Sequence, residues 1–226
     1  MRGRAGIFWS ALAVGFSGAM IPGPMLAVVL SESLNGRLWG SLGVVLGHVL
    51  LEAALLVALA QGAGGVLKKP AVGAVVGIVG GALLAYMGAS VVHTVLRDPG
   101  AMVANASLVS LPASPVVTGV LVSGSNPAWV MWWGAVGVGY VALALGQGRG
   151  GLLSFYVGHT LSDWVWYGAV AGLVTSGRQM LQGKPYLWLI SICGVLLVGF
   201  GLYFVSLGVR QVRQRQAAAA VRVREA

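Results

Sequence analysis

Two pairs of titratable side chains, each spaced four residues apart, lie inside long apolar stretches of this sequence. His48 is followed by Glu52, and His159 is followed by Asp163. Residues four apart in a helix share one face, so we expect each acid to lie beside the histidine of its own helix. A charged side chain at the centre of a membrane costs about 2.5–3.5 kcal/mol and is functional by default. We therefore interpret Glu52 and Asp163 as proton carriers assisted by His48 and His159.

The same four side chains have two other interpretations. They form a structural polar bridge between helices, or they bind a divalent metal ion, since two imidazoles and two carboxylates that face one another suit such a cation. No motif places a nucleophile beside a base, and Cys193 is the only cysteine, so thiol-pair chemistry is excluded. We expect no enzyme activity and no cofactor.

Two proline-containing breaks interrupt apolar stretches, at Pro22-Gly23-Pro24 and at Asn126-Pro127. Proline ends one helix and is well placed at the first position of the next, and asparagine is a good helix cap. A helix of eleven residues from Pro24 to Leu34 rises about 15 Å, half of a membrane core of about 30 Å. Each new helix would start near the membrane midplane, where its free N–H groups can bind a substrate carboxylate. The predicted substrate-binding residues are Pro22, Gly23, Pro24, Asn126 and Pro127. The alternative is a pair of packing kinks.

The amino-acid composition indicates that the helices carrying these residues lie in a membrane. Of the 226 residues, 58% are hydrophobic and 8% are charged, against about 25% charged in ordinary soluble domains. The mean hydropathy is +0.88, so a soluble globular domain and a disordered chain are both excluded. The net charge of +9 comes from residues between apolar runs and in the C-terminal tail, as in membrane proteins, and it does not indicate nucleic-acid binding.

Six membrane-spanning stretches follow from the charges and the helix breakers, and the sequence predicts an all-α polytopic membrane protein. The expected spans are 5–34, 38–67, 71–96, 116–145, 151–176 and 185–209. Six of the eight tryptophans fall into two groups: Trp9, Trp39 and Trp188 suit the membrane interface, whereas Trp129, Trp132 and Trp133 line a pathway or simply pack.

An internal repeat relates the two halves of the chain. The segment Gly47–Glu52 matches Gly158–Asp163, and Gly81–Leu84 matches Gly194–Leu197. Three spans per half make the second half enter the membrane from the opposite side, which is an inverted-topology repeat with broken first and fourth helices. The expected units are 1–97, a linker 98–114, the second repeat 115–210 and a basic tail 211–226.

The distribution of lysine and arginine predicts the orientation. With six spans, ten of these residues lie on the side that holds both termini and four lie on the other side. Positive loops stay in the cytoplasm, so both termini are expected to be cytoplasmic and the protein to be a multi-pass protein of the inner cell membrane. The expected partners are the lipid bilayer and a small-molecule substrate. The sequence is compatible with both a monomer and a homo-oligomer.

Several short motifs resemble the LysE/RhtB family of amino-acid exporters. They are Pro22-Gly23-Pro24, then Gly36-Arg37 with Gly40, the stretch from Gly81 to Gly88 with Tyr86, and Asn126-Pro127. The resemblance extends over about 15–210. It implies a six-helix inner-membrane secondary transporter that exports amino acids or similar metabolites with the proton gradient.

The sequence departs from that family at two places. Ala128 stands where the family often has lysine after Asn-Pro, and the second helix carries His48 and Glu52 in place of an evenly spaced second glycine pair. The wider superfamily is similar to several metal-ion transporters. A divalent metal-ion permease that uses His48, Glu52, His159 and Asp163 is therefore the alternative function.

Overall fold

The computed structural model describes residues 3–21, 23–64, 69–99, 114–177, 179 and 183–224, which are helical with short turns and contain no strand. The helices of the first half are α1 (Arg4–Ala19), α2 (Pro24–Leu34), α3 (Leu38–Ala58), the π-helical turn η1 (Leu59–Ala63) and α5 (Pro70–Arg97). Those of the second half are α7 (Pro115–Gly124), α8 (Pro127–Trp132), the π-helical turn η2 (Trp133–Gly137), α9 (Val138–Leu145), α10 (Gly148–Gly177) and α11 (Lys184–Arg224). The all-α prediction is confirmed.

Several of these elements are long and apolar enough to cross a membrane. They are Leu38–Gly62, Ala71–Arg97, Pro127–Leu145 and Leu187–Gln214, and the bent pair α1 and α2 forms a fifth if it is one span. α10 has 30 residues but carries His159, Thr160, Ser162 and Asp163, which make it less apolar. A multi-pass membrane protein is therefore supported, and six spans remain a prediction.

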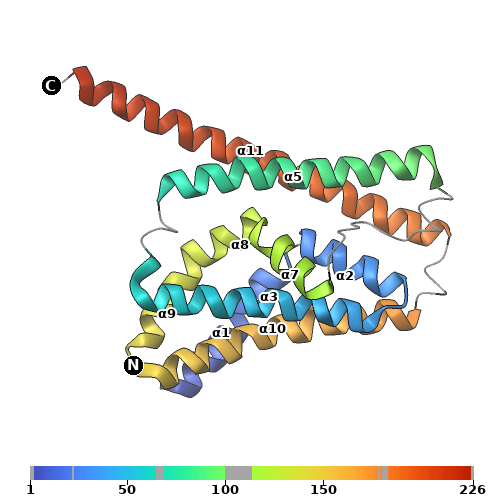
Figure 1. The fold of residues 1–226 in the computed structure, drawn as a ribbon, viewed down its shortest axis with the longest axis horizontal. Helices are drawn as coiled ribbons and strands as arrows, with labels where there is room; N and C mark the ends of the chain where they lie inside the picture. Colours follow the sequence, from blue (N-terminus) through green and yellow to red (C-terminus); the bar gives the residue numbers. More distant parts are fainter. Residues whose placement is uncertain are drawn as a thin grey trace.

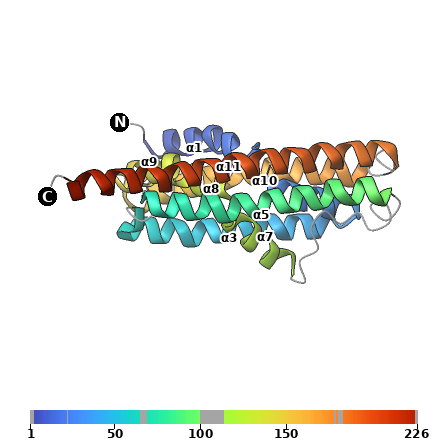
Figure 2. The same cartoon turned by 90° about the horizontal axis from the view of Figure 1, so that it is seen from above.

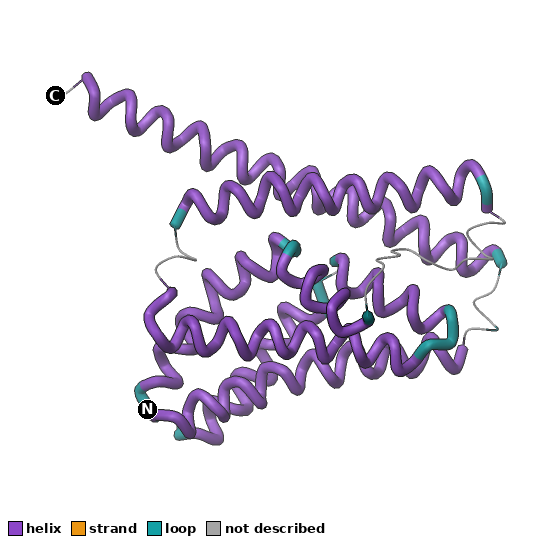
Figure 3. The backbone as a smooth tube through the Cα atoms, in the orientation of Figure 1, coloured by secondary structure: helices purple, strands orange, loops and turns teal. Residues whose placement is uncertain are grey.

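The two predicted breaks are present, and local chemistry explains them. α2 starts at Pro24 after the extended residue Gly23, and its axis is bent by 80° from that of α1. α8 starts at Pro127, and the Asn126 side chain accepts a hydrogen bond from the Ala128 N–H at 3.0 Å. Figure 3 shows both breaks inside the bundle and away from its two ends.

The helices form a bundle in which α5 and α11 pack along each other on one side (Figure 1). On the other side α1 packs along α10, and α3 packs along α7 and α10. The two termini lie at the same end of the bundle in both views (Figures 1 and 2). α11 continues beyond the predicted sixth span through the basic tail to Arg224 and extends past the bundle.

Glycines allow the closest helix approaches. A Cβ atom at Gly47 of α3 would meet the backbone of Val116 in α7, and one at Gly158 of α10 would meet the backbone of Phe8 in α1. A Cβ at Gly201 of α11 would likewise meet the backbone of α5. Small residues let helices approach each other in this way in membranes. The packing of Gly47 and Gly158 also places the histidines that follow them inside the bundle.

Candidate functional site

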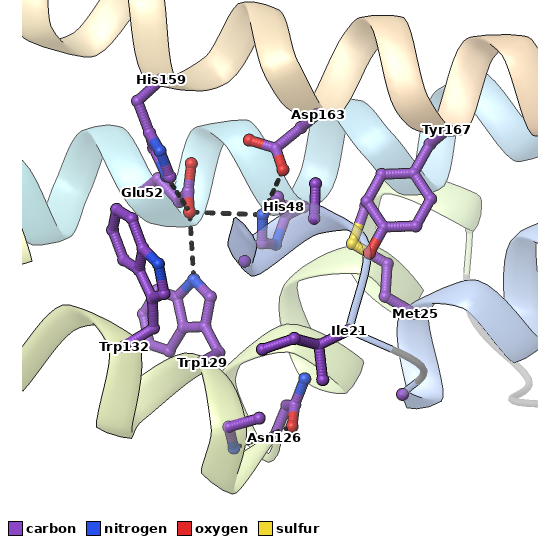
Figure 4. A pocket seen from close by; sticks show the side chains of 14 residues that line it. Ile21, Met25, His48, Glu52, Asn126, Trp129, Trp132, His159, Asp163 and Tyr167 are labelled. Atoms are coloured by element: carbon purple, nitrogen blue, oxygen red, sulfur yellow. Dashed lines mark hydrogen bonds and ion pairs between the residues drawn. The ribbon is translucent and has the colours of Figure 1, made fainter. Parts of the chain in front are cut away.

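A partly open cavity of about 40 Å³ lies between the two helix breaks and the two helices that carry the His–acid pairs. Its volume gives room for a few water molecules. α1, α2, α3, α8 and α10 contribute to its wall. The lining residues, many of which are labelled in Figure 4, are Gly18, Ala19, Ile21, Gly23, Met25, His48, Glu52, Asn126, Ala128, Trp129, Trp132, His159, Asp163 and Tyr167. None of these lining residues is a lysine or an arginine.

The structure brings the two His–acid pairs together, although they are more than a hundred residues apart in sequence. His48, Glu52, His159 and Asp163 are all buried. His48 Nε2 lies 3.2 Å from Glu52 Oε1, as the i,i+4 spacing predicts. The expected partnership within the second pair is wrong. His159 Nε2 lies 3.1 Å from Glu52 Oε1, and the ion-pair contact of Asp163 is with His48 Nε2, at 3.8 Å from its Oδ1 (Figure 4).

Glu52 is the centre of this network. Its Oε1 accepts hydrogen bonds from the indole N–H groups of Trp129 at 3.2 Å and Trp133 at 3.1 Å. Indole N–H groups only donate, so Oε1 is an acceptor and carries no proton, and the Nε2 atoms of His48 and His159 face it as donors. Four nitrogen atoms from three parts of the chain thus hold one carboxylate oxygen.

The two histidines are positioned by further contacts. His48 Nδ1 lies 2.8 Å from Ser123 Oγ of α7. The His159 ring stacks on Trp132, with ring centroids 4.5 Å apart, and on Phe155, with centroids 5.8 Å apart. His159 Nδ1 is buried without a hydrogen-bond partner in the described part of the chain. Both rings therefore present Nε2 to the acids.

Only some of the predicted substrate-binding residues line the cavity. Gly23 and Asn126 line the cavity. Pro24 and Pro127 start the two helices but are not among the lining residues, and Pro127 packs against Gly80 of α5. Pro22 lies outside the described residues.

Sequence reasoning missed the donors to Glu52. Trp129 and Trp133 are four residues apart at the start of the helix after the second break, and the tryptophan cluster was the only signal for them. Gly137 leaves the space for the Trp133 ring, because a Cβ there would meet the indole. The π-helical turn η2 begins at Trp133, and such turns often occur at functional sites.

Three of these side chains also lie close enough together to bind one metal ion. Ligand atoms of His48, Glu52 and Asp163 lie within 4.8 Å of one another. However, Glu52 Oε1 already accepts two indole N–H groups, which a cation bound to this atom would repel or displace. Of the Glu52 carboxylate, only Oε2 is thus left without a hydrogen-bond partner that a cation would displace.

Comparison with known proteins identifies related chains. The family described as LysE type translocator matches residues 16–208. The chain is 25% identical over 207 residues to the "Putative amino acid efflux protein YcgF" of Bacillus subtilis (strain 168), covering 91% of this chain and 98% of that protein. It is 27% identical over 194 residues to the "Chemotactic transduction protein ChpE" of Pseudomonas aeruginosa, covering 85% of this chain and 94% of that protein. No solved structure matches significantly.

Proposed function

Because this chain belongs to the LysE family of translocators, we propose that it is a secondary transporter of the cytoplasmic membrane that exports an amino acid or a similar small metabolite in exchange for protons. The observation that carries the proposal is the buried cluster of Glu52, Asp163, His48 and His159 in the wall of a cavity at two helix breaks. Intramembrane acids in such a position mark ion and substrate pathways. The relative from Bacillus subtilis is named as an amino acid efflux protein.

The substrate carboxylate binds at the first turn of α2 in this proposal. The N-cap Gly23 offers no side chain to the free N–H groups of the first turn, whereas Asn126 caps α8. Gly23 and Met25 both line the cavity. The positive end of the α2 dipole favours an anionic group there.

Two inverted three-helix repeats move against each other in the proposed transport cycle. The support is that each half of the chain packs its second long helix against the first helix of the other half. Gly47 of α3 packs against α7, the first helix of the second half, and Gly158 of α10 packs against α1, the first helix of the first half. The corresponding third helices, α5 and α11, pack on each other. With six spans and the basic tail, both termini are cytoplasmic.

The test is transport by the purified protein in proteoliposomes with an imposed pH step and a panel of labelled amino acids. We expect uphill flux for at least one of them, and the double variant Glu52→Gln with Asp163→Asn should lose it. The matched control is Glu32→Gln. Glu32 is an acid at the end of α2 that pairs with Arg37 at 2.8 Å and does not line the cavity. Undiminished uphill flux in the double variant would reject the role of the two acids.

Elemental analysis of the purified protein distinguishes the alternative, a divalent metal-ion permease, from the amino-acid exporter. Stoichiometric metal that is lost in His48→Ala and His159→Ala would favour the permease. We expect no such metal, because donors surround Glu52 Oε1 and leave only Oε2 of this carboxylate to a cation.

A further inference from the structure

The two buried acids have different surroundings, and we propose that they have different tasks: Asp163 binds either the ammonium group of the substrate or a proton, while Glu52 remains a fixed hydrogen-bond acceptor. This inference rests on the proposed function and deepens it. It names the residue that recognises the substrate amine, and it explains the exchange by competition at one carboxylate.

Glu52 has no capacity left for a substrate at Oε1. A carboxylate oxygen has two lone pairs, and this one faces the nitrogen atoms of Trp129, Trp133, His48 and His159 at 3.1–3.2 Å. These donors come from α3 itself, from α8 with η2, and from α10, so the carboxylate is held from several sides. An ammonium group at Oε1 would have to displace donors whose own N–H groups would then be buried and unpaired, which costs free energy.

Asp163 lacks such partners. The contact of its Oδ1 with His48 Nε2 is 3.8 Å long, beyond an ordinary hydrogen bond. Its Oδ2 is buried without any hydrogen-bond partner among the described residues, as is Glu52 Oε2. The difference between the two acids is that Glu52 Oε1 faces four nitrogen atoms at 3.1–3.2 Å, which the Asp163 carboxylate lacks. Its carboxylate lines the cavity (Figure 4). A buried, unpaired carboxylate oxygen is costly, and a bound ammonium group or a proton removes that cost.

The remaining lining favours a cation at Asp163. Tyr167, Trp129 and Trp132 present aromatic rings to the cavity, and the faces of such rings attract cations. None of the lining residues is a lysine or an arginine that would compete for the carboxylate. The cavity of about 40 Å³ has room for an ammonium group beside Asp163. Gly23 lines the same cavity, so the carboxylate of the substrate lies toward Gly23 and the start of α2.

Competition between a proton and the substrate ammonium group for Asp163 couples the proton flux to the substrate flux. A protonated carboxyl group has lost the charge that attracts an ammonium group, so proton binding releases the substrate and substrate binding requires that the proton has left. The titratable groups that face Asp163 are His48 and Glu52 from α3, with His159, Tyr156 and Tyr167 from α10 itself. α1 and α2 add no charged side chain to the cavity lining.

The experiment measures binding to the full-length purified protein by thermal stabilisation at several pH values. The probes are the standard amino acids and, for each one that binds, the matching amine without the carboxylate and the matching acid without the amine. Simple alkylamines are included whatever the result for amino acids. We expect the acid to lose at least tenfold in affinity and the amine to retain binding. Affinity should weaken as the pH falls, by up to about tenfold per pH unit, the limit for competition with one proton.

The variants separate the two acids. Asp163→Asn should lose the pH dependence and at least tenfold in amine affinity, whereas Asp163→Glu should keep the pH dependence. Glu52→Gln should be less stable but should keep the pH dependence of binding. The wild-type comparison of amine with acid remains decisive if Asp163→Asn does not fold.

The outcomes distinguish the inference from the proposed function. Equal binding of the acid and the amino acid, or pH-dependent binding in Asp163→Asn, overturns the inference and leaves amino-acid export standing. Conversely, pH-dependent binding of alkylamines by a protein that transports no amino acid supports the inference and makes amino-acid export wrong. If neither amines nor amino acids bind, both proposals are wrong.

Discussion

The indole N–H of Trp133 donates a hydrogen bond to Glu52 Oε1 over 3.1 Å, and both side chains are buried. The bond connects η2, just after the second helix break, with α3 of the other half of the chain. It therefore fixes the broken fourth helix against the helix that carries the acid. The stability of this arrangement is open to direct measurement.

Replacing Trp133 with phenylalanine should destabilise the protein by about 1.5–3 kcal/mol, because a buried carboxylate loses a donor. Chemical unfolding of the purified protein in detergent measures this change. The matched control is Trp166→Phe, since the Trp166 Nε1 has no hydrogen-bond partner in the described structure. Equal stability of the two variants would show that the bond to Glu52 contributes nothing.

A methyl group at Gly158 should separate α10 from α1. Its Cβ would meet the backbone of Phe8, and overpacking of this kind costs about 1–3 kcal/mol. Gly168 lies in the same helix with nothing within 4 Å of its Cβ position, so Gly168→Ala should be neutral or slightly stabilising. Thermal unfolding of both variants checks the difference. A Gly158→Ala protein as stable as Gly168→Ala would contradict the close contact.

Asn126→Ala should remove the cap of α8. The side chain accepts a hydrogen bond from the Ala128 N–H at 3.0 Å, and loss of such a cap costs about 0.5–2 kcal/mol. Asn126→Ser retains a capping oxygen and should recover most of the stability. Unfolding midpoints of the two variants and the wild type provide the comparison. If serine fails to rescue, the asparagine acts through cavity contacts and not as a cap.

Acidification should affect the two sides of the membrane in opposite ways. When Asp163 binds either a proton or an ammonium group, a lower pH on the release side accelerates substrate release, and a lower pH on the loading side slows loading. Flux assays in proteoliposomes with each side buffered separately measure both effects. Asp163→Asn should show neither. Acceleration by acid on the loading side would contradict competition.

The sequence predicted the elements because their signals are local. Proline at Pro24 and Pro127 lacks the N–H that a continuing helix needs, so the breaks follow from a few neighbouring residues. The alternation of apolar runs with charged or breaking residues gave helix limits close to those observed, except that α11 continues through the predicted tail. The i,i+4 contact of His48 with Glu52 is also local.

The site depends on contacts that no local spacing encodes. His159 was expected beside Asp163, but its Nε2 contacts Glu52 of another helix. The tryptophan cluster was visible in the sequence, yet nothing there indicated that Trp129 and Trp133 donate to Glu52. The sequence repeat made the two acids look equivalent, whereas the fold surrounds Glu52 Oε1 with donors and gives Asp163 only a contact of 3.8 Å with His48.

Amino-acid order alone therefore determined that the chain is helical, belongs in a membrane, breaks at two prolines and buries two acids. Only the tertiary structure decided which donors each acid receives. The physical reason is that side chains on different helices meet according to how the helices rotate and cross, and close packing at residues such as Gly47 and Gly158 sets that geometry. Hydrogen bonds act over about 3 Å, so a small rotation of one helix changes the partner and with it the chemistry of the acid.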